Sequence, residues 1–271
     1  VTLTLTIYLD SRALNISTRA FVQTGDDVLI GGFIIQGDID KEVVVRAIGP
    51  SLAVNGIPLA GALADPTLEL RDSTGALVAS NDNWTTDNQS YVLINLNIAP
   101  TDFHEAALYR VLSPGEYTVI IRGANDTTGI ALAEAYDINS GQEDNPRLGN
   151  ISTRGRVETA DNVMIGGFII GGPADAPMLI RGLGPSLAAK NISDPLVDPR
   201  LDLYNEQGTK IASNDNWQDT QKDEIEATGL APTDPREAAI RELLAPGAYT
   251  AVLSGVDGTT GVALVEAYNL P

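Results

Sequence analysis

The chain has 271 residues, of which 43% are hydrophobic, and it contains no cysteine. This composition is typical of a globular protein, and the lack of cysteine excludes disulfides, thiol nucleophiles and cysteine-ligated metals. The formal net charge of −19 makes nucleic acid a poor partner, because phosphate contacts require clustered lysine and arginine. The sequence has no apolar run long enough to predict a membrane span.

The first ten residues alternate strictly between apolar and polar side chains. The apolar members, which would share one face of a strand, are Val1, Leu3, Leu5, Ile7 and Leu9. This pattern has high β propensity, with no proline, no glycine and no charge before Asp10. Because a free strand of this kind promotes aggregation, we expect it to be paired. Two alternatives stay open: pairing within its own chain, or addition to the sheet of a second copy by donor-strand complementation.

Residues 11–138 show the signals of short β-strands. The expected strands are residues 28–35, 42–46, 67–71, 76–79, 108–111, 117–122 and 129–136. Turn-forming residues separate them, as at 72–75 (Asp-Ser-Thr-Gly) and 113–115 (Ser-Pro-Gly). About seven or eight strands with frequent turns are typical of an antiparallel sandwich.

Helix is expected at few places. Residues 219–227, with Ile225 as an apolar anchor, are the best candidate, and residues 87–96 are a more ambiguous counterpart. A polar segment with glycine and proline at 139–148 predicts a short linker. Since it is short, we expect the regions on either side of it to touch.

The chain after the linker repeats the chain before it. The repeated motifs are Asn-Ile-Ser-Thr-Arg at 15–19 and 150–154, Ile-Gly-Gly-Phe-Ile-Ile at 30–35 and 165–170, Gly-Pro-Ser-Leu-Ala at 49–53 and 184–188, Ser-Asn-Asp-Asn-Trp at 80–84 and 213–217, Ala-Pro-Thr-Asp at 99–102 and 231–234, and Glu-Ala-Tyr at 134–136 and 266–268. A repeat this long indicates a duplicated domain. We therefore predict an all-β protein with two tandem, homologous antiparallel β-sandwich domains of jelly-roll type. Their bounds are 11–138 and 149–271, after an N-terminal extension strand at 1–10.

The back half of each unit carries a further set of short motifs. In the first unit these are Asp-Pro-Thr-Leu-Glu-Leu-Arg-Asp at 65–72, Gly75, Ala-Ser-Asn-Asp at 79–82 and Leu-Ser-Pro-Gly-Glu-Tyr-Thr at 112–118. In the second unit they lie at 198–204, Gly208, 212–215 and 244–250. This pattern resembles the bacterial pre-peptidase C-terminal domain, a β-sandwich appended to secreted enzymes. The resemblance implies export, a sandwich fold, a non-catalytic role and calcium as an optional ligand.

Catalysis is not expected. His104 is the single histidine, and its counterpart in the second unit is Arg236. No combination of nucleophile, base and orienting group is apparent in the sequence. We therefore predict that the protein is not an enzyme and requires no cofactor.

The best ligand-type clusters are two repeated loops. They contain Asn81, Asp82 and Asn83 in the first unit, and Asn214, Asp215 and Asn216 in the second. Hard cations such as calcium prefer several such oxygens, and the repeated acids Asp65, Asp198, Asp102 and Asp234 could complete a shell. The competing interpretation is that these loops form Asx-turns and caps.

A tryptophan, Trp84 or Trp217, follows each loop. Each ring has two interpretations: a platform that stacks against carbohydrate, or a side chain packed in the core.

The function predicted from these features is structural. The chain opens on valine and shows no basic or apolar leader, so we expect a mature, exported form with an extracellular or cell-surface location. We predict a subunit of an extracellular filament or surface matrix, in which copies of the chain join head to tail by exchange of the N-terminal strand. The alternative is a secreted adhesion module that binds carbohydrate or calcium.

Overall fold

The computed structural model describes residues 12–54, 56–138 and 147–270, and it confirms the all-β class. The strands of the first half are β1 (Arg12–Val22), β2 (Leu29–Gln36), β3 (Lys41–Ile48), β4 (Ala53–Val54), β5 (Ile57–Pro58), β6 (Pro66–Asp72), β7 (Leu77–Asn81), β8 (Ala106–Leu112), β9 (Gly115–Gly123) and β10 (Gly129–Asp137). Those of the second half are β11 (Arg147–Val157), β12 (Met164–Gly171), β13 (Ala176–Leu183), β14 (Pro199–Asn205), β15 (Lys210–Asn214), β16 (Ala238–Leu244), β17 (Gly247–Gly255) and β18 (Gly261–Asn269).

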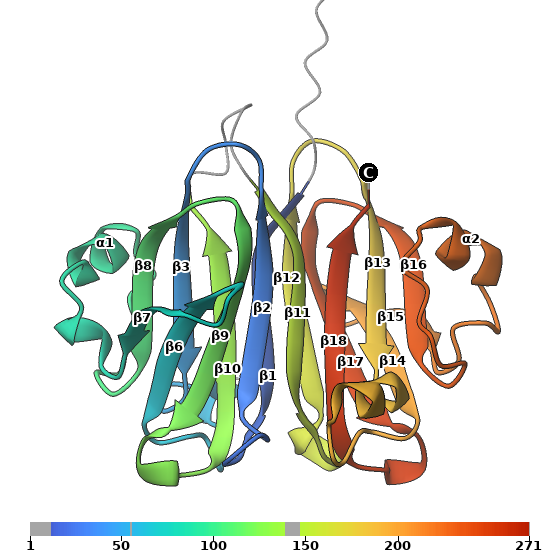
Figure 1. Cartoon of the computed structure of the whole chain (residues 1–271), viewed down its shortest axis with the longest axis horizontal. Coiled ribbons are helices and arrows are strands. Elements are labelled where there is room, and N and C mark those ends of the chain that lie inside the picture. The colour runs from blue at the N-terminus through green and yellow to red at the C-terminus, as the bar shows by residue number, and fades with distance from the viewer. Residues whose placement is uncertain (1–11, 55, 139–146, 271) are drawn as a thin grey trace, which may run out of the picture.

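Helices are short and lie at the two outer ends of the molecule (Figure 1). They are α1 (Ser90–Asn95) and α2 (Lys222–Ala227), which lie beside β8 and β16. The 3₁₀ turns are Trp84–Thr86, Ala124–Asp126, Ala160–Asn162, Pro185–Lys190 and Val256–Gly258. Within the described residues, no helix is long and apolar enough to cross a membrane.

Sixteen strands form one continuous antiparallel sheet, and only the hairpin of β4 and β5 lies apart from it. The sheet consists of two runs of strands, in the orders β8-β3-β10-β1-β12-β17-β14-β15 and β16-β13-β18-β11-β2-β9-β6-β7. A single residue pair, Phe21 with Arg156, joins the two runs. Each run passes through both halves of the chain.

Each half is a sandwich because the two runs face each other with alternating apolar side chains. In β6, for example, Leu68 and Leu70 are buried, whereas Glu69 between them points away from the core. Residues of both runs and both halves belong to one hydrophobic core. The sandwich architecture was thus predicted correctly from the strand pattern.

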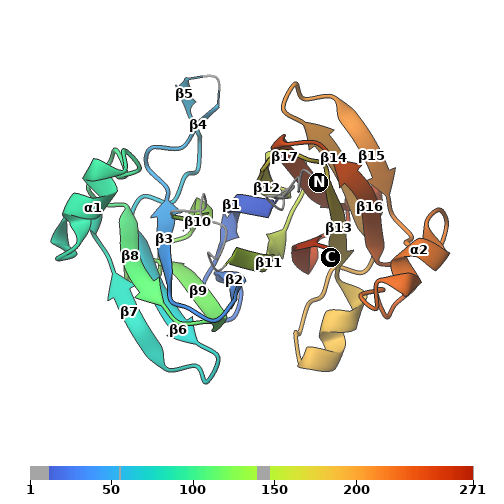
Figure 2. The ribbon, with the colours of Figure 1, turned by 90° about the horizontal axis from the view of Figure 1, so that it is seen from above.

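Strands of one half also pair with strands of the other half, and the sequence analysis did not predict this pairing. Strand β1 lies between β10 of its own half and β12 of the other half. Strand β11 likewise lies between β18 of its own half and β2 of the first. Viewed from above, β1 and β11 lie at the centre of the molecule, between the two sandwiches (Figure 2). We call the paired strands β1, β2, β11 and β12 the seam.

Most expected elements lie where the sequence placed them. All seven predicted strands of the first half overlap observed strands, and the candidate helices at 87–96 and 219–227 contain α1 and α2. Strands β1 and β11 were missed. The predicted extension strand at 1–10 and most of the linker at 139–148 lie outside the described residues.

Candidate functional site: the seam and the repeated motifs

The seam pairs two of the repeated motifs with each other across the halves. In β1 and β12, Ser17 lies opposite Gly167. In β11 and β2, Ser152 lies opposite Gly32. The Ile-Ser-Thr-Arg motif of each half therefore pairs with the Ile-Gly-Gly-Phe motif of the other half, in the same register both times. This reciprocity explains why the two motifs are repeated together.

A side chain on the glycine at either pairing would collide with the hydroxyl of the serine opposite it. A Cβ atom on Gly32 would lie 2.9 Å from Ser152 Oγ, and one on Gly167 would lie 2.8 Å from Ser17 Oγ. Gly155 of β11 is similarly constrained, since its Cβ would lie 3.3 Å from Ala20 Cβ of β1. A larger residue at these positions would require the neighbouring side chains or strands to shift.

Side chains related by the repeat meet at the centre of the seam. Thr18 and Thr153 are 2% and 3% exposed, and their hydroxyl oxygens lie 2.8 Å apart. Gln23 Nε2 donates to Glu158 Oε1 at 3.3 Å. Both pairs join residues 135 positions apart, so each residue contacts its own counterpart. This is the contact pattern of an approximate twofold axis.

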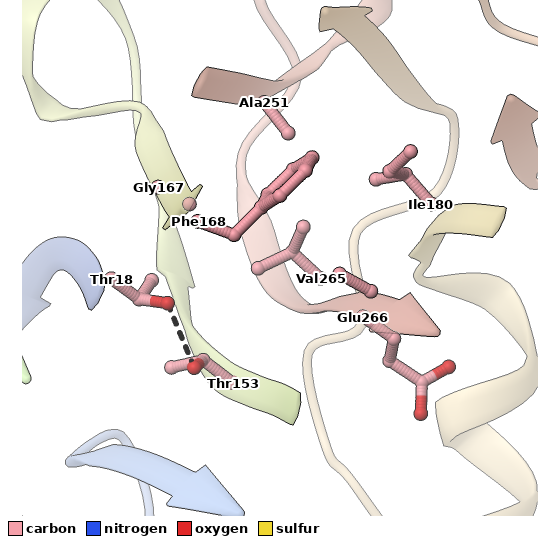
Figure 3. Close-up of a pocket in the computed structure, with 10 residues that line it drawn as sticks. Thr18, Thr153, Gly167, Phe168, Ile180, Ala251, Val265 and Glu266 are labelled. Carbon is pink, nitrogen blue, oxygen red and sulfur yellow. Dashed lines mark hydrogen bonds between the residues drawn. The ribbon is translucent and has the colours of Figure 1, made fainter. Parts of the chain in front are cut away.

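Two small cavities flank the threonine pair. One is lined by Thr18, Thr153, Phe168, Val265 and Glu266 (Figure 3). Its counterpart in the first half is lined by the same threonines with Phe33 and Glu134. Each cavity has a volume of about 20 Å³, which accommodates about one water molecule. The seam therefore packs the two halves together and has no room there for an organic ligand.

The repeated Glu-Ala-Tyr motif forms a buried charge network beside each cavity. Arg46 Nε donates to Glu134 Oε2 at 2.8 Å, and its guanidinium carbon lies 5.0 Å from the centre of the Tyr136 ring. Burial, and then the charge of Glu134, raise the pKa of Tyr136 well above its usual value. Arg181 repeats both contacts in the second half at the same distances. The motif is thus explained by local structure.

The repeated Gly-Pro-Ser motif wraps around a buried carboxylate. Glu105 is fully buried, and its Oε1 accepts the backbone N–H groups of Gly49 and Ser51 at 3.0 and 2.9 Å. Glu237 accepts the corresponding groups of Gly184 and Ser186 at 3.1 and 3.0 Å. Neither glutamate was singled out from the sequence, since one acid among 36 has no local signature.

In each predicted calcium loop, the amide of the first asparagine, Asn81 or Asn214, holds the loop in place through hydrogen bonds. Asn81 Nδ2 donates to the carbonyl of Asn83 at 3.0 Å, and Asn81 Oδ1 accepts the N–H of Ala107 in β8 at 3.0 Å. Asn214 makes the equivalent contacts with Asn216 and Ala239, at 3.0 and 2.9 Å. These contacts match the interpretation of the loops as structural turns. Among the described residues, no group of three or more histidine, aspartate or glutamate side chains is arranged to hold a metal ion.

The two tryptophans anchor the segments under the short helices. Trp84 Nε1 donates to the carbonyl of Asp102 at 3.1 Å, and Trp217 Nε1 donates to that of Asp234 at 3.2 Å. Trp217 is only 4% exposed and packs with Ile225 of α2. The ring of Trp217 is therefore a core side chain and leaves no face open to carbohydrate. Trp84 is half-buried in the equivalent cluster.

The repeated acids Asp65 and Asp198 lie near these loops. The Oδ1 atoms of Asp65 and Asp198 are buried without a hydrogen-bond partner. Burial, followed by the charge of a neighbouring aspartate, raises the pKa of each carboxyl; the neighbours are Asp82 and Asp215. Asp82 is exposed and Asn83 is half-buried.

His104 serves as a partner for a carboxylate. Its Nδ1 lies 3.0 Å from Asp102 Oδ1, and its counterpart Arg236 donates through Nη2 to Asp234 Oδ2 at 2.8 Å. Histidine in one half and arginine in the other thus fill the same role, a cationic or hydrogen-bonding group beside the repeated aspartate.

Comparisons with known proteins add little. No protein-family model matches the chain, and no curated protein matches it. The chain is similar to a solved DUF4785 family protein from Legionella pneumophila, with 7% sequence identity and a TM-score of 0.24, over 98% of this chain and 88% of that chain. A sequence identity and a TM-score this low support no inference about fold or function. The resemblance to the pre-peptidase C-terminal domain stays a prediction from the sequence.

Proposed function

We propose that the protein is an exported structural subunit of an extracellular filament or surface matrix. In this proposal, residues 1–10 of one copy add as a strand to a sheet of the next copy. The observation that most supports this proposal is the position at which β1 begins. Arg12 pairs with Gly171, the last residue of β12, and β10 on the other side ends at Asp137. A strand that continued β1 in line would find no described strand of this chain beside it.

The way in which the two halves are joined supports the same mechanism. The sheets of the two halves join edge to edge, β1 with β12 and β11 with β2, so lateral pairing of strands from two homologous units already holds this fold together. The apolar face of residues 1–10 carries five aliphatic side chains. Burial of each contributes roughly 1.5–3 kcal/mol before the entropy cost of ordering the strand. A head-to-tail contact that does not close produces an open filament.

Paired point variants test this proposal. Leu5→Asp places a charge on the apolar face and is expected to abolish assembly, whereas Thr4→Asp on the polar face is the matched control and is expected to leave assembly intact. Electron microscopy of the purified full chain measures filament length. A synthetic peptide of residues 1–10 in excess is expected to shorten the filaments by capping their ends. Equal assembly by both variants would contradict the proposal.

The second candidate is a calcium-binding adhesion module, favoured by the buried, unpartnered Oδ1 atoms of Asp65 and Asp198. Burial, and then the charge of Asp82 or Asp215, raise the pKa of Asp65 and Asp198, and a bound cation would stabilise their ionised forms. Binding to the folded state must raise its stability. Melting of the full chain in chelator and in millimolar calcium measures this effect, and unchanged melting would remove the candidate.

A further inference from the structure

The continuous sheet has four outer edges, and two of them are already covered. The edge of β8 is capped by Asn81, which accepts the N–H of Ala107. The edge of β16 is capped more completely, since Gln221 accepts the N–H of Arg241 at 2.9 Å and donates to its carbonyl at 2.7 Å. Helices α1 and α2 lie alongside these two edges (Figure 1). An incoming strand would have to displace these contacts.

The other two edges, β7 and β15, are counterparts that differ in their first two residues. Both strands end in Ala-Ser-Asn, but β7 begins with Leu77 and Val78, whereas β15 begins with Lys210 and Ile211. Leu77 and Val78 are 54% and 40% exposed. Lysine on an edge strand is a common protection against unwanted strand pairing. By this criterion β15 is protected and β7 is not.

Charged side chains lie beside both edges, but of the two edge strands β15 alone carries a cation; beside β7, Arg71 of β6 lies 2.7 Å from Glu69 of the same strand. Beside β15, Asp202 lies 3.5 Å from Lys210 Nζ and accepts the hydroxyl of Ser213 at 2.6 Å, and Arg200 also reaches Ser213 at 3.3 Å. In the first half, Thr67 and Leu77 stand at the positions of Arg200 and Lys210.

An open groove lies beside β7. Its volume is about 650 Å³, and it lies at the last residues of β7, Ser80 and Asn81. The rest of its lining comes from β6, β8 and the loop segments at 82 and 86–88, with Glu69, Asp82, Asp87 and Arg110 as the charged residues. Hydroxyl, amide and carboxylate groups of this kind can accept hydrogen bonds from, or donate them to, the backbone of an incoming strand. The edge that lacks lysine therefore also has space beside it.

We propose that β7 is the acceptor edge for the N-terminal strand of the next copy, and that β15 is not; this inference rests on the proposed function. Exposed Leu77 and Val78 then contact the apolar side chains of the donor strand. Each chain has one donor and one acceptor, so assembly gives unbranched, polar filaments. Acceptors at both β7 and β15 would instead give branching.

Cysteine cross-linking of the full chain tests the choice of edge, because the natural sequence contains no cysteine. One cysteine replaces each of residues 3–8 in turn, which covers every register and both faces of the donor. The second replaces Val78 or, as the matched control, its counterpart Ile211. Mild oxidation is expected to give a ladder of covalent multimers with the Val78→Cys series only.

Other outcomes separate the two proposals. A ladder with the Ile211→Cys series, or filaments without a ladder in either series, would overturn β7 as the acceptor but leave strand exchange standing. An intramolecular disulfide in a monomer that never polymerises would overturn both.

A charge test on the exposed edge gives an independent measurement. The double variant Leu77→Lys/Val78→Lys copies the protection of β15 and is expected to lower polymer mass at a fixed concentration roughly tenfold or more, which corresponds to about 1.4 kcal/mol per tenfold. Ile211→Lys is the control and is expected to leave polymer mass unchanged. Unchanged thermal melting of both variants shows that folding is retained. Equal polymer loss in both variants would overturn the assignment.

Discussion

The seam and the outer ends of the molecule have diverged to different extents between the two halves. At the seam, Thr18 meets Thr153 and both serine–glycine pairings recur in the same register. At the outer ends, α1 exposes Tyr91 and Ile94, at 61% and 59%, whereas Asp223 and Glu226 take their places on α2. These residues at the seam are kept, whereas these outward-facing residues of the helices differ. The halves are thus one fold with two different outer surfaces.

The largest expected effect concerns a buried ion pair found in the first half. Lys41 Nζ lies 2.5 Å from Asp137 Oδ1, and both side chains are fully buried, whereas Ala176 and Asn269 occupy these positions in the second half. Lys41→Ala is expected to lower the free energy of unfolding by about 3–5 kcal/mol, because it leaves a buried charge. The double variant Lys41→Ala/Asp137→Asn copies the second half and is expected to recover most of this loss. Urea unfolding measures both, and an additive loss in the double variant would contradict the interpretation.

The next effect tests the close fit at the seam. Gly32→Val is expected to lower stability by about 1–3 kcal/mol, because its side chain would overlap Ser152. Gly31→Ala is the matched control, since its Cβ would lie 3.9 Å from the nearest atom and is expected to change stability little. Replacement of Ser152 by glycine is expected to offset part of the Gly32→Val loss. Chemical denaturation of the three variants decides the matter, and equal losses for the two glycine variants would refute the fit.

A smaller effect depends on pH. The pKa of Asp65 is raised above its ordinary value of 3.8 by burial and by Asp82, so the folded state holds this proton more tightly than the unfolded chain does. Stability from this group therefore falls as the pH rises above 3.8. Asp65→Asn removes the penalty, so its melting temperature is expected to exceed that of the parent at pH 7. The difference should vanish as the pH falls toward the ordinary value, and an advantage that grows on acidification would have the wrong sign.

The smallest expected effect lies at the outer ends. Tyr91→Asp and Ile94→Glu give α1 the residues of α2, and both positions are exposed. Each change is expected to alter the free energy of unfolding by no more than about 0.5 kcal/mol, as is usual for exposed positions. Leu93→Asp, at a fully buried position on the same helix, is the destabilising control. Thermal melting measures all three.

Strands within each sandwich were predictable because one of their faces is buried and the other is not, as Leu68, Glu69 and Leu70 show. Strand β1 was missed because several of its buried positions carry polar residues, such as Asn15 and Thr18, so its sequence lacks an alternating apolar pattern. Its pairing with β12 could not be read from local pattern, since it joins segments about 150 residues apart by a register that only the folded seam defines.

The repeated loops show a similar limit. Asparagine and aspartate at 81–83 are compatible with both a turn and a cation site, because both use the same oxygens. What separates the two is the partner of Asn81 Oδ1, the N–H of Ala107, which lies 26 residues away in β8. The motif located the loop, and the tertiary contact defined how its amide is used.

The most direct test of the account is the mass distribution of the full chain beside that of a variant that lacks residues 1–9. Analytical ultracentrifugation at matched concentrations measures both, and circular dichroism checks that both are folded. The account predicts large, concentration-dependent polymers for the full chain and a folded monomer for the truncated one. A full chain that sediments as a 28.6 kDa monomer, or a truncated chain that polymerises equally well, would contradict it.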